Sequence, residues 1–394
     1  MVKSAPEVDQ PTYEIVSDVE RYDERDQPNA RILLMPGTPE FEEYYSRHPE
    51  LLEKDNELRQ ISADAMKSKR EKDPVNIQFR PSTFYGRFVL GDIGIVEGTT
   101  RSAHAPKGTP AQVDVDPAEM ARKIKGFGKH MGAAQVRITK LRQEWVQTNR
   151  AYPYTTEPYG TPVELDYENI ICMTFPHDMA MEKCGVGVAN SLESGWRYAY
   201  GSLVAVIMAQ FIRGLGWRTR ALPSENAPYL VVPTFVDAGI GEQGRCSFVV
   251  TKEFGNNFKP SAVATDMPLS LDKPVDFGIQ DFCEKCHLCA DYCPSGAISH
   301  GEKEVIRGVK RWAFDGDKCR RLWAKVAGNC SICIAVCPWC HPNGLVHDTV
   351  RELAQNFPNL RNLLIRGEKL YYGKYKPTPE PDWIHGKGTR DSSG

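Results

Sequence analysis

Residues 192–217 carry the clearest periodic pattern of hydrophobic and polar positions in the chain. Apolar side chains recur there at i, i+4, i+7, i+8, i+11 and i+15, which places them on one face of a helix. The members of this face are Tyr200, Val204, Ile207, Met208, Phe211 and Leu215. Two glycines, Gly214 and Gly216, lie where the pattern stops, so the sequence predicts a long buried helix that ends there.

The other hydrophobic patterns alternate between strand and helix. Residues 168–176 and 227–236 contain short, nearly continuous apolar runs, which are typical of buried strands. Residues 117–132 have a helical period that Gly132 ends, and residues 37–55 predict another helix, which begins near Thr38. Helices and strands mixed around one core predict an α+β fold.

Composition divides the chain into four segments. Residues 1–80 are polar and rich in turns, and we expect them to wrap the core, which residues 81–280 should form as an α/β unit. Residues 281–345 hold most of the 12 cysteines and should form a compact metal module. Residues 346–394 end in a stretch rich in Pro and Gly and should be a C-terminal extension.

Charge and hydropathy exclude two classes of partner. The 394 residues carry a net charge of −2 and no dense run of Lys and Arg, so we expect no nucleic-acid partner. The longest apolar run, from Tyr200 to Ile212, is shorter than the ~20 residues that a membrane span needs. The first residues of the sequence show neither an apolar signal segment nor twin arginines.

Eight cysteines form two related motifs. The first motif is C-x2-C-x2-C-x3-C-P, and the second has ten residues between its first two cysteines but also ends in C-x2-C-x3-C-P. Paired motifs of this kind are typical of two-cluster bacterial ferredoxins, in which the fourth cysteine of each motif ligates the other cluster. By that rule, one [4Fe–4S] cluster is held by Cys283, Cys286, Cys289 and Cys337, and the second is held by Cys293, Cys319, Cys330 and Cys333.

Haem attachment and zinc binding are two alternative interpretations of the same cysteines. The stretches from Cys283 to His287 and from Cys337 to His341 both spell C-x-x-C-H, a signal for haem attachment, and C-x2-C pairs also bind zinc. Two haems would leave five cysteines of the motifs unused and would not explain the two C-P endings. The iron–sulfur interpretation uses all eight cysteines, so we expect two clusters and an electron-transfer role.

Several stretches around the cysteine motifs carry a more specific resemblance. They are "VERYDERDQPNARILLMPGTPEFEEYY", "AQFIRGLGWRTRALPSENAPY", "GNNFKPSAVATDMPL", "FCEKCHLCADYCPSGAIS" and "CSICIAVCPW". With these stretches in this order, the chain resembles the cobamide-dependent reductive dehalogenases of organohalide respiration over residues 20–345. The N-terminal stretch and "NNFKPS" are most similar to the subgroup that acts on chlorinated alkanes.

The resemblance implies a fold and two kinds of cofactor. The fold would be a nitroreductase-like α/β core that encloses a cobamide, with a ferredoxin-like module of two [4Fe–4S] clusters against it. The cobamide, of the cobalamin or norpseudo-B12 type, would be bound base-off without a protein histidine on cobalt. Trp339 follows the second cysteine motif and is a candidate contact for the corrinoid.

The resemblance also implies three catalytic residues. They are a tyrosine that donates a proton, assigned to Tyr200, together with Asn226 and Lys259. We choose Tyr200 over the alternative Tyr198 because Tyr200 belongs to the apolar face of the predicted helix, whereas Tyr198 lies away from that face. Four tryptophans are candidates for the substrate pocket: Trp145, Trp196, Trp323 and Trp339.

These residue types suit a reductive dehalogenation. Replacement of a carbon–halogen bond by carbon–hydrogen consumes two electrons and one proton and releases halide. A phenol holds its proton tightly at neutral pH, and a cation close to it stabilises the phenolate, so a lysine beside the tyrosine makes a better acid. Asn226 would orient the hydroxyl group or the substrate.

Two other functions remain open at this point. Epoxyqueuosine reductase pairs the same cofactors but acts on tRNA, and the net charge of −2 argues against it. A non-catalytic ferredoxin-type electron-transfer subunit would need only the two clusters.

The resemblance finally implies partners and a location. It predicts a small organohalide substrate, a small membrane-anchor subunit, a respiratory electron donor and a homodimer. It predicts a peripheral protein on the outer face of the cytoplasmic membrane. Export would use a twin-arginine leader that is absent from the sequence printed here.

Overall fold

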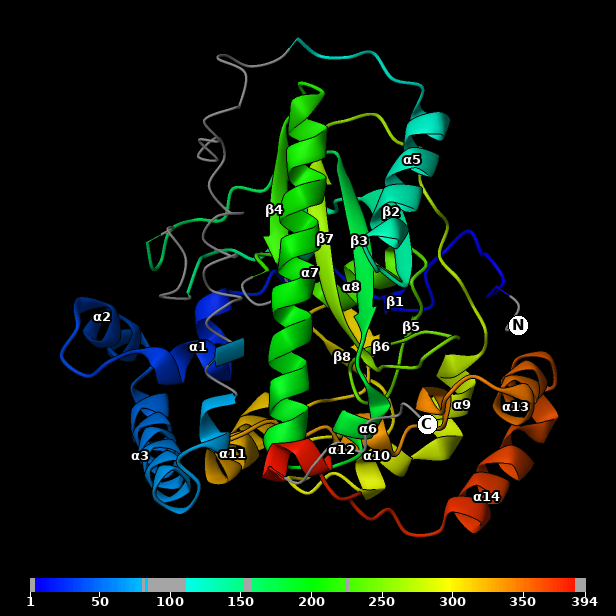
Figure 1. The fold of residues 1–394 in the computed structure, drawn as a ribbon. Coiled ribbons are helices and arrows are strands. Elements are labelled where there is room, and N and C mark those ends of the chain that lie inside the picture. Colours follow the sequence, from blue (N-terminus) through cyan, green and yellow to red (C-terminus); the bar gives the residue numbers. More distant parts are fainter. Residues whose placement is uncertain (1–3, 80–81, 84–110, 152–157, 224–226, 387–394) are drawn as a thin grey trace.

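A four-stranded antiparallel sheet forms the centre of the computed structural model, which describes residues 4–79, 82–83, 111–151, 158–223 and 227–386 (Figure 1). The strand order is β2-β3-β7-β4. The strands are β2 (Gln135–Lys140), β3 (Asn169–Pro176), β7 (Phe258–Thr265) and β4 (Thr219–Pro223). In the two central strands, β3 and β7, most side chains are buried, because both faces of the sheet are covered.

Helices cover both faces of this sheet. The long helix α7 (Val188–Gly214) and the shorter α5 (Pro117–His130) lie on one face, where Ile124, Met208 and Ile171 belong to one buried apolar cluster. The helix α8 (Val231–Asp237) and the segments around it cover the other face. The register pairs Phe175 of β3 with Lys259 of β7, so Lys259 lies at the end of the sheet where β7 begins.

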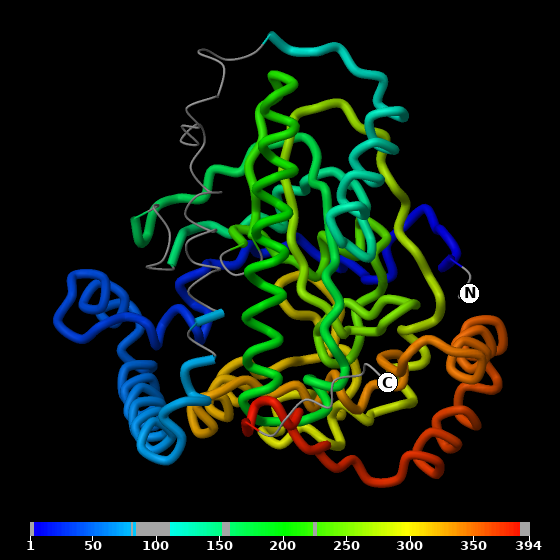
Figure 2. Tube along the Cα trace, viewed as in Figure 1, coloured from blue at the N-terminus to red at the C-terminus, as the bar shows by residue number. Residues whose placement is uncertain are grey.

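The N-terminal residues form a helical layer beside the core. Its helix α3 packs along α11 of the cysteine module, and its strand β1 pairs with β9 of that module. The elements of the layer are β1 (Glu14–Ile15), η1 (Glu24–Asp26), α1 (Pro28–Leu33), α2 (Pro39–Arg47), α3 (Pro49–Lys72) and η2 (Asn76–Gln78). Figure 2 shows the helices α1, α2 and α3 of this layer (blue) and the helices at residues 345–372 (orange) on opposite sides of the molecule.

The cysteine module lies below the end of α7 that carries its N-terminus (Figure 1). Its elements are α9 (Ile279–Cys286), α10 (Leu288–Asp291), β8 (Glu304–Ile306), β9 (Val309–Arg311), α11 (Gly316–Val326), α12 (Ile332–Ala335) and η4 (Pro338–Cys340). The C-terminal elements are α13 (Leu345–Asn356), η5 (Pro358–Leu360), α14 (Arg361–Tyr372) and η6 (Asp382–His385). The short connecting elements are η3 (Gln143–Trp145), α6 (Met179–Glu182), β5 (Glu242–Gln243) and β6 (Val249–Val250).

Two of the predicted elements are confirmed, and two need correction. The strand at 168–176 is β3, and the helix at 117–132 is α5, after which Gly132 has a φ of 87°. The strand predicted at 227–236 is wrong, because Val231–Asp237 form α8, whose proline lies in the first turn, where a missing N–H is tolerated. The helix predicted over residues 37–55 is two helices, since α2 ends at Arg47 and α3 begins at Pro49.

The long helix exists, but its buried face differs from the predicted one. Met208 is fully buried, whereas Ile207 and Phe211 are 39% and 37% exposed. The face against the sheet contains many small residues, and a Cβ atom on Gly201 would lie 3.1 Å from the Phe175 ring. Because these small residues let α7 pack close to the strands, apolar bulk alone did not identify the inner face.

None of the helices in the described part of the chain combines the length and the hydropathy that a bilayer span requires.

Candidate functional site: a cavity between the core and the cysteine module

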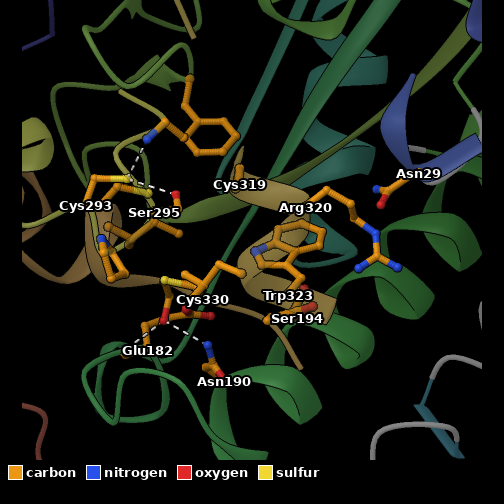
Figure 3. Close-up of a pocket in the computed structure, with 18 of the residues that line it drawn as sticks. Asn29, Glu182, Asn190, Ser194, Cys293, Ser295, Cys319, Arg320, Trp323 and Cys330 are labelled. Carbon is orange, nitrogen blue, oxygen red and sulfur yellow. Dashed lines mark hydrogen bonds between the residues drawn. The ribbon is translucent and has the colours of Figure 1, made fainter. Parts of the chain in front are cut away.

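A cavity of about 650 Å³ lies where three regions of the structure meet (Figure 3). The core contributes residues of α7, α6 and β7 and His177, which follows β3, and the cysteine module contributes residues of both its cysteine loops and α11. The N-terminal layer closes a further side with residues such as Asn29 of α1 and Arg70 of α3. The volume lies within the range of roughly 300–1,000 Å³ that is usual for cofactor and ligand pockets.

The wall that α7 provides is polar. Asn190, Ser194 and Tyr198 follow one another at intervals of four residues, which places them on one side of the helix, and all three line the cavity. Asn190 is anchored at the helix start, where its Oδ1 accepts a hydrogen bond from the Gly187 N–H at 3.2 Å. Its Nδ2 donates to Ser331 Oγ at 3.1 Å, which ties this end of α7 to the cysteine module.

Lys259 lies next to this wall. Its Nζ is 4.4 Å from the centre of the Tyr198 ring, and both residues line the cavity. A cation over an aromatic face is attracted by the negative face of the ring. The pair therefore joins a phenol and an ammonium group on adjoining elements, α7 and β7, at the cavity wall.

A buried histidine–carboxylate pair completes this side of the cavity. His177 follows β3, and its Nδ1 lies 2.9 Å from Oε1 of Glu182 on α6, with side-chain exposures of 1% and 2%. Burial raises the pKa of Glu182, but the contact with His177, the charge of Lys259 and a hydrogen bond from Ser331 outweigh it, so that the pKa of this carboxyl is lowered overall. Glu182 is therefore a carboxylate at neutral pH.

The opposite wall contains the cysteines that the sequence assigns to the second cluster. Cys293, Cys319, Cys330 and Cys333 all line the cavity, and their thiols are close enough to affect one another electrostatically. Cys293 Sγ accepts a hydrogen bond from the Ala297 N–H at 3.3 Å and contacts Ser295 Oγ at 3.4 Å. Figure 3 shows Cys319 and Cys330 beside Trp323 and Arg320 of α11.

The cysteines assigned to the first cluster gather on the far side of the second group, and none of them lines the cavity. Cys283 interacts with the thiols of Cys286 and Cys337, and Cys289 interacts with those of Cys283 and Cys337. Cys246, which is outside the motifs, approaches the first group at Cys289 and the second at Cys333. The structure thus brings the eight motif cysteines together in the two sets that the crossed-ligand rule predicts.

The chemistry of these two sets suits a bound metal cluster. Burial raises the pKa of the Cys286 thiol to about 12, and the neighbouring Cys337 thiolate adds to the rise. Burial likewise raises the pKa of Cys319 to about 12, with contributions from Cys330 and Cys293. Crowded, buried thiols ionise readily only when a cation balances their charge, which iron in a cluster does. Within the described ranges, no group of three or more His, Cys, Asp and Glu side chains is arranged to hold a single metal ion.

The catalytic residues expected from the sequence do not all meet at the cavity. Lys259 lines it, but Tyr200 does not, because its hydroxyl donates to the Met131 carbonyl at 2.8 Å and its ring packs against Phe175 in the core. The neighbour considered as the alternative, Tyr198, takes the place beside Lys259. Asn226 lies outside the described residues.

Of the four tryptophans, Trp323 lines the cavity. Trp339 is 3% exposed and packs against Phe277 and Phe282 beside the first cysteine group, away from the cavity wall. Trp145 is buried, and its indole N–H donates to Asp237 at 2.9 Å, while Trp196 stacks on Tyr200 at the surface.

Sequence reasoning missed His177, Glu182 and the polar stripe on α7. The spacing of Asn190, Ser194 and Tyr198 was a usable signal, because a polar row on an otherwise apolar helix needs a polar or occupied neighbour. The pairing of His177 with Glu182 depends on how β3 leads into α6, and no spacing in the sequence indicates it.

Comparison with known proteins supports this arrangement. Residues 282–340, which contain all eight motif cysteines, match the family "4Fe-4S dicluster domain", and the module is therefore one that holds two such clusters. The chain is 32% identical over 291 residues to the tetrachloroethene reductive dehalogenase of Sulfurospirillum multivorans, a match that covers 66% of this chain and 58% of that protein.

A solved structure described as a reductive dehalogenase with a mechanism for B12-dependent dehalogenation has the same fold. Its TM-score is 0.71 at 24% identity, over 93% of this chain and 48% of that one. An epoxyqueuosine reductase of Pseudomonas aeruginosa is more distant, at 23% identity over 67% of this chain and 81% of that protein. The chain spans between about half and three fifths of the length of the two dehalogenases.

Proposed function

This chain is a relative of the reductive dehalogenases in both sequence and fold, and from that premise we propose that it replaces a carbon–halogen bond with carbon–hydrogen in a small organohalide. The observation that carries the proposal is the position of the cavity. It has the second cysteine group on one wall and the Tyr198–Lys259 pair on another. A cavity between an electron-transfer module and a proton donor suits a reaction that consumes both electrons and a proton.

The cavity residues fit a cobamide. The pocket adjoins the cluster module directly, and its walls combine apolar side chains such as Leu33, Phe248 and Trp323 with a few polar groups that point inward. When bound there, a cobamide supplies the reducing cobalt centre at which a carbon–halogen bond is cleaved.

The residues of the chain would supply the path for the electrons and the proton. The two cysteine groups hold the clusters, and the order in space predicts that electrons pass from the first group to the second and then to the cavity. The Tyr198 hydroxyl donates the proton that completes the new carbon–hydrogen bond. Lys259, 4.4 Å from the ring centre, stabilises the phenolate that remains.

The overall reaction balances with these groups. Two electrons arrive through the clusters, one proton comes from Tyr198, the organic halide becomes the hydrogenated product, and halide leaves. Solvent then returns a proton to the phenolate. A chlorinated alkane is the substrate class that we propose, because the stretches "NNFKPS" and "VERYDERDQPN" resemble that subgroup most.

We also propose the partners and the location that the resemblance implies. The chain would act with a small membrane-anchor subunit and a respiratory electron donor, as a homodimer at the outer face of the cytoplasmic membrane after export through a twin-arginine leader. These assignments are tested by co-purification with a membrane fraction and by the mass of the native complex.

The experiment that tests the proposed activity is anaerobic reconstitution with iron, sulfide and cobalamin. We expect about eight irons and one cobalt per chain, and release of chloride from a chlorinated alkane with a low-potential reductant. The control is protein reconstituted with iron and sulfide alone, which should hold eight irons and release no chloride. Protein that holds eight irons but never retains cobalt would contradict the proposal and leave only an electron-transfer role.

A further inference from the structure

Neither nitrogen of the His177 imidazole makes a hydrogen bond with a described residue, although Nδ1 lies 2.9 Å from Glu182 Oε1. Nε2 is buried, and it has no hydrogen-bond partner among the residues that the structure describes. An unpaired buried polar atom costs roughly 1–3 kcal/mol, so such atoms in folded proteins usually have a partner that the protein itself does not supply. The residue lines the cavity, which is where that partner has room to bind.

The backbone holds His177 in place from both sides. Its N–H donates to the Asn257 carbonyl at 3.2 Å, and its carbonyl accepts from Asn257 Nδ2 at 3.1 Å. Asn257 lies two residues before Lys259, so the segment that positions the imidazole also leads into β7. The side chain therefore has a fixed location relative to the Tyr198–Lys259 pair.

Glu182 determines which nitrogen carries the proton. Its carboxylate oxygen lies 2.9 Å from Nδ1, a close contact although neither atom has a well-aligned hydrogen bond. A carboxylate next to Nδ1 favours the tautomer with a proton on that nitrogen. Nε2 then carries a lone pair, and it needs a donor from the occupant of the cavity.

The substrate and the cofactor differ in whether they can donate a hydrogen bond to His177 Nε2. A chlorinated alkane has no N–H or O–H group and cannot donate a hydrogen bond. A corrinoid has acetamide and propionamide side chains around its ring, and each amide carries two N–H donors. The corrinoid is therefore the occupant that can satisfy Nε2.

We propose that His177 Nε2, oriented by Glu182, accepts a hydrogen bond from a side-chain amide of the corrinoid and fixes the rotation of the ring in the cavity. This inference rests on the proposed function, because it requires a corrinoid in the cavity. It assigns His177 a role in binding the edge of the ring.

The test compares two corrinoids on cluster-loaded protein. Cobinamide retains the side-chain amides, and heptamethyl cobyrinate has methyl esters that cannot donate. Absorbance titration gives the dissociation constant of each probe for the wild type, His177→Phe and His177→Gln. His130→Phe is the control, since His130 is an exposed histidine at the end of α5.

We expect His177→Phe to weaken cobinamide binding roughly tenfold and to leave binding of the ester within about twofold of the wild type. His177→Gln, which keeps an acceptor oxygen, should lie between the wild type and His177→Phe, and His130→Phe should equal the wild type. Circular dichroism checks that each variant folds, and iron content checks that it carries both clusters. If His177→Phe does not fold, Glu182→Gln provides the same comparison, with a smaller loss confined to cobinamide.

Three results would overturn the inference. The first is an equal loss for both probes, which would indicate packing, and the second is no loss for either probe. The third is a nitrogen splitting in the Co(II) electron paramagnetic resonance spectrum that changes with ¹⁵N-histidine, which would place the imidazole on cobalt. A wild type that binds neither probe would instead refute the proposed function.

Discussion

Two faces of α7 carry tyrosines that are two residues apart and have different surroundings. Tyr200 packs against the sheet, where its hydroxyl satisfies the Met131 carbonyl at the end of α5. Tyr198 lies on the row that begins at Asn190 and faces the cavity, with Lys259 over its ring. The two residues therefore have different surroundings: Tyr200 contributes to packing, and Tyr198 lines the cavity beside Lys259.

This difference shows why an apolar stripe is a poor guide to a catalytic tyrosine. The stripe was expected to mark the buried face, but Ile207 and Phe211 on it are partly exposed. Tyr200 on the same stripe packs against Phe175, away from the cavity. A proton donor needs a cavity with room for substrate, so it belongs on the face where small and polar residues interrupt the packing. On α7, Asn190 and Ser194 mark that face.

A large effect on the rate is expected at Lys259, the partner of Tyr198 on the cavity side of α7. Lys259→Gln removes the cation beside Tyr198, and we expect kcat per bound cobalt to fall by about 10²- to 10³-fold, the usual loss when a group that stabilises developing charge is removed. Lys259→Arg keeps the charge and should retain activity within roughly tenfold of the wild type. Equal losses in the two variants would show that charge is not what Lys259 contributes.

A substitution at Tyr200 should lower the stability of the protein and leave the rate of dehalogenation nearly unchanged. Tyr200→Phe removes the hydrogen bond to Met131, and we expect the free energy of unfolding to fall by about 1 kcal/mol, while turnover stays within about twofold of the wild type. Thermal unfolding of the anaerobic holoprotein measures the first quantity and chloride release the second. If Tyr200→Phe lost as much turnover as Lys259→Gln, the two faces of α7 would not differ in function as we propose.

A pH-dependent effect separates the stability of the cysteine module from the chemistry of the cavity. Burial raises the pKa of Glu242 to about 7, although its carboxylate accepts hydrogen bonds from the Phe277 and Ile279 N–H groups at the start of α9. Because the folded protein holds this proton more tightly than the unfolded chain does, the contribution of Glu242 to stability is fully present below pH ~4.5 and is lost as the pH rises to about 7.

Glu242→Gln removes this dependence, since an amide does not ionise. The variant should equal the wild type in acid and exceed it by about 2–3 kcal/mol or less near pH 8, with turnover unchanged. Unfolding temperatures measured between pH 5 and pH 8 provide the check. A parallel pH profile in wild type and variant would mean that Glu242 ionises normally in the fold.

Much of the structure follows from local sequence, and the site follows only in part. The cysteine spacing led to both thiol groups because loop ligands are close in the chain, and β3 was clear from its apolar run. The strand predicted over residues 227–236 failed because an apolar segment of that length suits a buried helix equally well, and the sequence gives no tertiary context to decide.

The site was harder to predict because its parts come from distant segments. Lys259 came from resemblance, and the sequence pattern favoured Tyr200 as its partner, whereas the structure places Tyr198 beside Lys259. The register of a helix against a sheet depends on small residues such as Gly201, which an apolar pattern does not reveal. His177 and Glu182 meet only through the turn between β3 and α6. Neither residue belongs to a motif, so only the folded structure brings them to attention.

The central claim is that Tyr198, and not Tyr200, gives the proton, and the rate of dehalogenation per bound cobalt in Tyr198→Phe and Tyr200→Phe tests it most directly. We expect the rate to fall by about 10²- to 10⁴-fold in Tyr198→Phe, with iron and cobalt contents unchanged. In Tyr200→Phe the rate should stay close to that of the wild type. A large loss in Tyr200→Phe together with near-normal turnover in Tyr198→Phe would contradict it.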